Sequence, residues 1–115
     1  MTQDPSVPTL EVTVEPRAPW MVVRPSGELS FGSRALLETR LLALVRDEDQ
    51  LSICVDMSGV TFCDSSGIAC LLQGSKAARE RGGTLVLSQP RPAVSRLLVL
   101  LDLTSLLPVV DESPA

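Results

Sequence analysis

The sequence contains no histidine and no tyrosine, and only three of its 115 residues are aromatic. Without histidine, the chain has no imidazole to serve as the base for a serine or cysteine nucleophile. The pattern G-x-S-x-G of a nucleophile elbow and the pattern G-x-x-x-x-G-K-S/T of a phosphate-binding loop are also absent. These absences predict a protein that is not an enzyme, with a core built from leucine, valine and isoleucine.

A positive net charge, a long apolar run and a leader segment are missing as well. The net charge of −4 argues against a nucleic-acid-binding surface. The aliphatic run Leu97–Leu101 is too short to span a bilayer, and Met1–Pro5 lacks the basic and apolar regions of a secretory signal. We therefore expect a cytoplasmic protein that contacts neither nucleic acid nor membrane directly. Five basic residues are expected to form solvated helix faces or a partner-contacting rim: Lys76, Arg79, Arg81, Arg91 and Arg96.

The sequence contains only three cysteines, which is an odd number. Cys54, Cys63 and Cys70 form no C-x-x-C pattern, and there is no histidine to complete a metal site with them. They are expected to be reduced, mostly buried thiols. The sequence therefore predicts neither a metal nor another cofactor.

The hydrophobic pattern predicts one α/β domain over residues 10–110, between flexible tails at 1–9 and 111–115. Period-2 alternation and short apolar runs predict strands at 10–15, 20–24, 51–57, 84–87 and 106–110. Helical spacing predicts helices at 33–47 and 65–81, and a third that begins at residues 90–92. The order β-β-α-β-α-β-α-β predicts a mixed four- to five-stranded sheet with amphipathic helices packed on it.

Several boundaries follow from local signals. Pro25-Ser26-Gly27 is expected to end the second strand, and the segment 58–64 is expected to be a loop. Ser33 is expected to cap the first helix, and Pro108 predicts an edge position for the last strand. Two helical stripes are expected to be buried: Leu36, Leu37, Leu41, Leu42 and Val45 in the first helix, and Val94, Leu97, Leu98 and Leu101 in the third.

The most informative segment is Asp64-Ser65-Ser66-Gly67, which begins the helix predicted at 65–81. Two hydroxyl groups there lie at a helix N-terminus, where unpaired backbone N–H groups favour negative charge. Asp64 is a candidate N-cap, and Gly67 is a position where backbone or partner can approach closely. From the residues alone, Ser65 is either a cap-like structural serine or a site that tolerates a phosphate.

The run Asp56–Gly67 resembles the STAS domain of bacterial anti-sigma factor antagonists, whose motif is D-x-S-x-(V/L)-x-F-x-D-S-(S/T)-G. The matching residues are Asp56, Ser58, Val60, Phe62, Asp64, Ser65, Ser66 and Gly67. Gly27-Glu28-Leu29 resembles the family's G-E-L-D segment, and Ser88–Leu98 looks like the entry to its last helix. The resemblance covers about residues 10–110 and implies a single STAS domain.

The resemblance implies a function for this segment. In such proteins a serine kinase, itself the anti-sigma factor, phosphorylates the first serine of the pair, which is Ser65 here. The unphosphorylated antagonist binds that kinase and releases a sigma factor, and a phosphatase resets the switch. The implied partner-binding residues are Glu28, Ser30, Asp64, Ser66 and Gly67, whereas Asp56 and Ser58 are interpreted as hydrogen-bonding residues that hold the loop.

One position departs from the family pattern. The residue after Gly27-Glu28-Leu29 is an acid in the family, and the resemblance places that acid near the phosphorylated serine. Here it is Ser30. This substitution keeps a second hypothesis open, namely a STAS scaffold or regulatory subunit of a transporter or signalling assembly in which Ser65 is not a switch.

Overall fold

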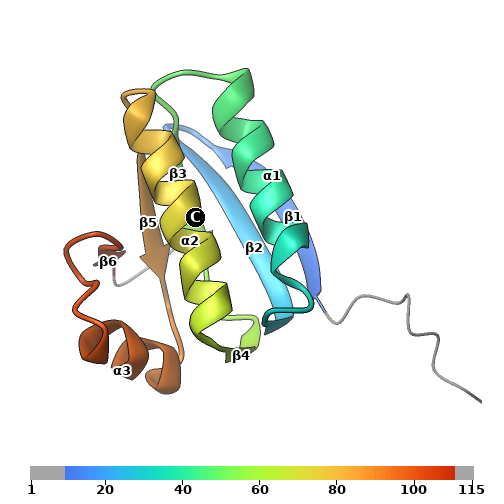
Figure 1. The fold of residues 1–115 in the computed structure, drawn as a ribbon. Helices are drawn as coiled ribbons and strands as arrows, with labels where there is room; N and C mark the ends of the chain where they lie inside the picture. Colours follow the sequence, from blue (N-terminus) through green and yellow to red (C-terminus); the bar gives the residue numbers. More distant parts are fainter. Residues whose placement is uncertain (1–9, 111–115) are drawn as a thin grey trace, which may run out of the picture.

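Alternating and helically spaced apolar residues fold residues 10–110 into a sheet with helices packed against it, as the computed structural model describes (Figure 1). The elements in chain order are β1 (Leu10–Arg17), β2 (Trp20–Leu29), α1 (Arg34–Asp47), β3 (Ser52–Asp56), β4 (Val60–Cys63), α2 (Ser65–Glu80), β5 (Thr84–Ser88), α3 (Pro92–Leu100) and β6 (Val109–Val110). The predicted α/β class is confirmed, but the sheet has six strands and not four or five, because the predicted order lacks β4. The tails predicted at 1–9 and 111–115 lie outside the described residues.

Five strands of the six-stranded sheet have the order β1-β2-β3-β5-β6. The sixth, β4, pairs with the C-terminal part of β2, beyond the residues of β2 that pair with β3. Only β1 and β2 are antiparallel to each other, and the remaining pairs in the described chain are parallel. Helices α1 and α2 lie side by side over one face of the sheet (Figure 1). The largest fully buried side chains, mostly leucines, belong to one core cluster: Leu10, Leu29, Leu37, Leu41, Ile53, Met57, Ile68, Leu71, Leu85, Leu87, Leu98 and Leu107.

The prediction of a loop over residues 58–64 was wrong, because β4 lies there. Its first residue, Val60, is fully buried, and the preceding Gly59 carbonyl accepts a hydrogen bond of 2.9 Å from the Gly27 N–H. A four-residue strand that follows a turn-like Ser-Gly pair has too short a period-2 signal to be recognised. The strand before the paired serines is therefore β4 and not β3.

The prediction that Pro25-Ser26-Gly27 ends the second strand was also wrong. β2 continues to Leu29, and Gly27 has a φ of 115° beside a shift in register between β2 and β4. Glycine adopts this conformation without the steric cost that a side chain would bring, which makes it suitable for a β-bulge. The residues that resemble a turn in the sequence thus form an irregular point inside a long strand.

The helices begin and end close to the predicted residues, but their buried stripes are narrower. In α1, Leu37, Leu41 and Val45 are buried, whereas Leu36 and Leu42 are each 42% exposed. A helix that covers one face of a sheet buries only the side chains that point toward the sheet, and the predicted stripe included residues on either side of these.

The C-terminal part of the described chain leaves several apolar side chains exposed. In α3, Val94 and Leu98 are buried as predicted, and Leu97 is partly buried, but Leu101 is 45% exposed. β6 contains only Val109 and Val110, so the strand predicted from residue 106 onward is shorter than expected. Pro108 lies immediately before this strand at the edge of the sheet, as predicted.

Candidate functional site

The paired serines open α2 at one end of the sheet. Asp64 is the N-cap, and its Oδ1 accepts a hydrogen bond of 3.1 Å from the Gly67 N–H. This bond satisfies one of the backbone donors that a helix N-terminus leaves without an intrahelical partner. Ser65 is the first helical residue, and its side chain is exposed. Within residues 10–110 the Ser65 hydroxyl makes no hydrogen bond to another residue, so it is available to an external group.

Gly67 holds the inner side of this turn against the sheet. A Cβ atom added to Gly67 would lie 2.7 Å from both Leu29 Cγ and the Leu29 carbonyl oxygen, and 2.9 Å from Cys63 Sγ. These distances are shorter than van der Waals contact, and the carbonyl oxygen belongs to the backbone of β2. Gly67 is buried, so its close approach is to β2 and β4 of its own chain. The close approach fixes the position of Ser65, two residues before it.

The loop from β2 to α1 lies beside this turn and is held by serine hydrogen bonds. The Asp64 N–H donates to the Leu29 carbonyl oxygen over 3.3 Å, which joins the start of α2 to the end of β2. The Ser33 hydroxyl donates to the Glu28 carbonyl oxygen over 2.6 Å and accepts from the Ser30 N–H over 3.0 Å. Ser33 occupies the N-cap position, but the predicted side-chain cap is absent, because its hydroxyl closes this loop instead.

The predicted partner-binding residues therefore gather at one end of the molecule. Asp64 caps α2, and Ser66 and Gly67 belong to its first turn, whereas Glu28 and Ser30 come from the end of β2 and the loop that follows it. Glu28 is exposed and lies opposite Phe62 in the register of β2 and β4. Their role in partner binding stays a prediction.

Two residues at this end were not among the predicted site residues. Phe31 in the β2–α1 loop is 74% exposed, and Phe62 in β4 is 52% exposed. The sequence offered one signal for them, namely the scarcity of aromatic residues. Because the core is built from aliphatic side chains, a phenylalanine is less needed there and can lie at the surface. The Arg34 guanidinium lies over the Phe31 ring, 5.4 Å from its centroid.

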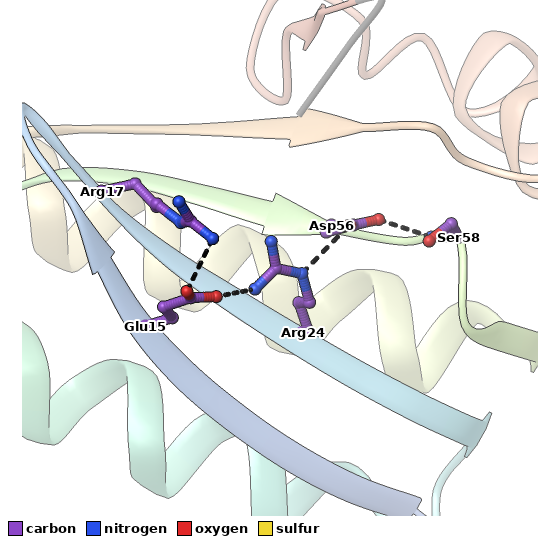
Figure 2. A network of polar contacts seen from close by, with 5 residues as sticks. All are labelled: Glu15, Arg17, Arg24, Asp56 and Ser58. Atoms are coloured by element: carbon purple, nitrogen blue, oxygen red, sulfur yellow. Dashed lines mark hydrogen bonds and ion pairs between the residues drawn. The ribbon is translucent and has the colours of Figure 1, made fainter. Parts of the chain in front are cut away.

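A row of charged side chains crosses β1, β2 and β3 (Figure 2). Arg24 lies between two carboxylates, with Nη1 2.6 Å from Glu15 Oε2 and Nε 3.4 Å from Asp56 Oδ2. Arg17 contacts the other oxygen of Glu15 at 2.8 Å. The hydrogen bond from Arg24 and the charge of Arg17 lower the pKa of the Glu15 carboxyl, and the Glu15 contact raises the pKa of Arg24.

This row also orders the connection between β3 and β4. The Ser58 N–H donates to Asp56 Oδ1 over 3.0 Å, and the Arg91 guanidinium donates to the Ser58 carbonyl oxygen over 3.2 Å. The interpretation of Asp56 as a hydrogen-bonding residue that holds the loop is confirmed, whereas Ser58 takes part through its backbone N–H and carbonyl oxygen. Because β4 leads directly into α2, these contacts help to determine where Ser65 lies.

The thiol nearest the paired serines is poorly reactive. Burial, with a contribution from the Asp64 charge, raises the pKa of Cys63 to about 11, and burial raises the pKa of Cys70 to about 12. Both thiols are therefore protonated at neutral pH, whereas only the deprotonated thiolate acts as a nucleophile or binds a metal.

In the part of the chain that the structure describes, no three His, Cys, Asp or Glu side chains are grouped so that they could hold a metal ion. None of the helices described here is both long and apolar enough to cross a membrane.

A family model for the STAS domain matches residues 9–113. The anti-sigma F factor antagonist of Paenibacillus polymyxa is 26% identical over 103 residues, which cover 90% of this chain and 88% of that protein. The anti-sigma-B factor antagonist of Bacillus subtilis (strain 168) is 30% identical over 88 residues, which cover 76% of each chain.

Solved structures share the fold. An anti-sigma factor antagonist from Mycobacterium paratuberculosis superposes with a TM-score of 0.80 at 24% identity, over 96% of this chain and 92% of that one. The unphosphorylated form of SpoIIAA, an anti-sigma factor antagonist, gives 0.75 at 20% identity, over 90% and 89% of the two chains. The murine Solute Carrier 26 family member A9 anion transporter gives 0.71 at 19% identity, over 82% of this chain and 16% of the transporter.

Proposed function

The chain belongs to the STAS domain family, and from this premise we propose that it is an anti-sigma factor antagonist switched by phosphorylation of Ser65. In its unphosphorylated form it binds an anti-sigma factor serine kinase in the cytoplasm and so releases a sigma factor. Phosphorylation of Ser65 ends this binding, and a phosphatase restores it. The protein acts by binding and not as an enzyme. The names of the two curated relatives support the antagonist role.

The observation that carries the switch is the exposed Ser65 hydroxyl on a firmly held helix turn. Asp64 caps the turn and Gly67 seats it on β2, so a kinase meets a serine in a fixed position. A phosphate would add a charge of roughly −1.5 to −2 beside the Asp64 carboxylate. In a desolvated interface this charge repels an acidic or apolar partner surface, whereas the helix N-terminus tolerates it within the antagonist itself.

Mass spectrometry tests the phosphorylation site. The chain is incubated with MgATP and, in turn, each purified anti-sigma factor serine kinase encoded by the source genome. We expect one kinase to add a single phosphate at Ser65, with no phosphate added to Ser65→Ala. The matched control is Ser105→Ala, which removes an exposed serine between α3 and β6 and should be phosphorylated normally. A phosphate found at another residue would contradict the assignment of Ser65.

Binding to the same kinase tests the consequence of phosphorylation. Ser65→Ala is expected to bind as the unphosphorylated chain does, and Ser65→Asp is expected to bind more weakly. Equal binding by the two variants would overturn the switch.

The second hypothesis, a scaffold without a switch, is favoured by Ser30. The Ser30 backbone closes the loop with Ser33, and no carboxylate is present at this position to assist transfer to Ser65. The fold shared with an anion transporter supports the same alternative. Absence of phosphorylation by every kinase of the panel, together with unchanged binding by Ser65→Asp, would favour the scaffold.

A further inference from the structure

Two of the three aromatic side chains of this chain lie exposed at the end of the molecule that contains Ser65. Phe31 is 74% exposed and Phe62 is 52% exposed. A scattered exposed leucine needs no explanation, but two phenylalanines beside one candidate site indicate a surface that another protein covers. Aromatic residues and arginine are enriched at protein interfaces, and interface binding energy is concentrated in a few such residues.

The two residues belong to backbone segments that meet near the start of α2. Phe62 lies in β4, three residues before Ser65, and is opposite Glu28 on β2. Phe31 follows Ser30 in the loop that leaves β2. The hydrogen bond from the Asp64 N–H to the Leu29 carbonyl oxygen holds these two segments side by side. In Figure 1, β4, the end of β2 and the first turns of α1 and α2 meet at this end of the sheet.

Both rings are carried by backbone that is already ordered. The Ser33 hydroxyl binds the backbone on both sides of Leu29, at Glu28 and Ser30, so the loop that carries Phe31 is closed by its own contacts. Phe62 is held by the pairing of β4 with β2. A side chain presented by ordered backbone loses less conformational entropy when a partner covers it, and so contributes more to affinity.

Resting on the function proposed above, we propose that Phe31 and Phe62 are the anchor side chains on which the anti-sigma factor docks over Ser65. The partner surface that fits them is apolar at two positions. Arg34 forms no ion pair with any residue in the range 10–110, and its guanidinium lies over Phe31. The matching partner surface therefore places an acidic side chain beside the apolar site for Phe31. A phosphate on Ser65 then enters an interface that is apolar and acidic on the partner side, which accounts for dissociation.

The experiment measures binding of the unphosphorylated chain to the purified anti-sigma factor serine kinases of the source genome by isothermal titration calorimetry. We expect Phe31→Ala and Phe62→Ala each to weaken binding about tenfold, and the double variant to weaken it further. The matched control is Leu100→Ala, because Leu100 is 75% exposed but lies at the end of α3, on the β6 side of the molecule. Binding by this control is expected to match that of the unaltered chain.

The outcomes separate the inference from the function on which it rests. If the unaltered chain binds a kinase and Ser65→Asp weakens that binding, but the phenylalanine variants bind normally, the anchor role is overturned and the switch stands. If the unaltered chain binds none of the kinases, the proposed function fails and the anchor role fails with it. Phe31→Leu and Phe62→Leu keep an apolar side chain and are expected to retain most of the affinity. If Leu100→Ala weakened binding as much as the phenylalanine variants do, the inference would also be overturned, because the loss of affinity would then not be specific to the end of the molecule that contains Ser65.

Discussion

The first turn of α2 has an inner side that is buried against the sheet and an outer side that is exposed. On the inner side, Gly67 and Ile68 are buried, and Gly67 leaves no room for a Cβ atom between itself and β2. On the outer side, Ser65 is exposed and makes no hydrogen bond to another residue of the described range. Asp64 lies between them, with its carboxylate on the Gly67 N–H.

This difference shows how a residue can change its charge without changing the fold. Because packing and capping are supplied by Gly67 and Asp64, the position of the turn does not depend on the Ser65 side chain. Substitutions on the inner side should therefore lower the free energy of unfolding, whereas substitutions on the outer side should change binding alone.

The largest effect on stability is expected from Gly67→Ala. The new methyl group would overlap the backbone oxygen of Leu29, and overpacking of this kind costs about 1–3 kcal/mol in the free energy of unfolding. The matched control is Gly32→Ala, because a Cβ at Gly32 has no atom within 4 Å. Urea unfolding of both variants checks the prediction, and equal stability of the two would show that the inner side is not tightly packed.

An intermediate effect is expected from Asp64→Ala. Loss of the N-cap leaves the Gly67 N–H without its acceptor and costs about 1 kcal/mol in the free energy of unfolding. Asp64→Asn retains an oxygen at the same position and should restore most of the stability. Thermal unfolding of the two variants would contradict the capping role if the asparagine variant were as unstable as the alanine variant.

The smallest effect on stability is expected from Ser65→Ala. An exposed hydroxyl without a partner contributes little, so its removal should change the free energy of unfolding by no more than about 0.5 kcal/mol. Differential scanning calorimetry of Ser65→Ala checks this prediction. The same measurement on Ser65→Asp should also show a small change, since an acid is tolerated at a helix N-terminus. A large loss of stability in Ser65→Ala would mean that the serine is a structural residue.

Much of the fold could be predicted because its signals are local. Apolar residues recur at helical spacing in 34–47 and 65–80, and Gly82, with a φ of 79°, follows the second of these helices. The errors occurred where a local signal had a tertiary explanation. Gly27 resembled the end of a strand, but it forms a bulge because β2 exchanges β3 for β4 as its neighbour at that point.

The part of the candidate site that is continuous in the sequence was predictable, and the part that depends on the fold was not. Asp64, Ser65, Ser66 and Gly67 are adjacent in the sequence, so their motif was visible as a unit. Phe31 was not, because α1, β3 and β4 separate it from Ser65 in the sequence, and its loop comes to the same end of the molecule only when β4 pairs with β2. Ser33 was assigned to a helix cap, and its actual contact with the Glu28 carbonyl oxygen depends on the path of the loop.

The sequence by itself determined the class of fold, the absence of histidine chemistry and the serine pair at a helix start, because composition and short-range spacing are sufficient for these. The tertiary structure decided which side of that helix start is accessible. Leu29 and Cys63 cover Gly67 and leave Ser65 exposed, since a helix turn pressed against a sheet can bury only one of its sides. It also decided that the two phenylalanines would be exposed at the same end of the molecule as the serine, because that depends on strand pairing between segments far apart in the chain.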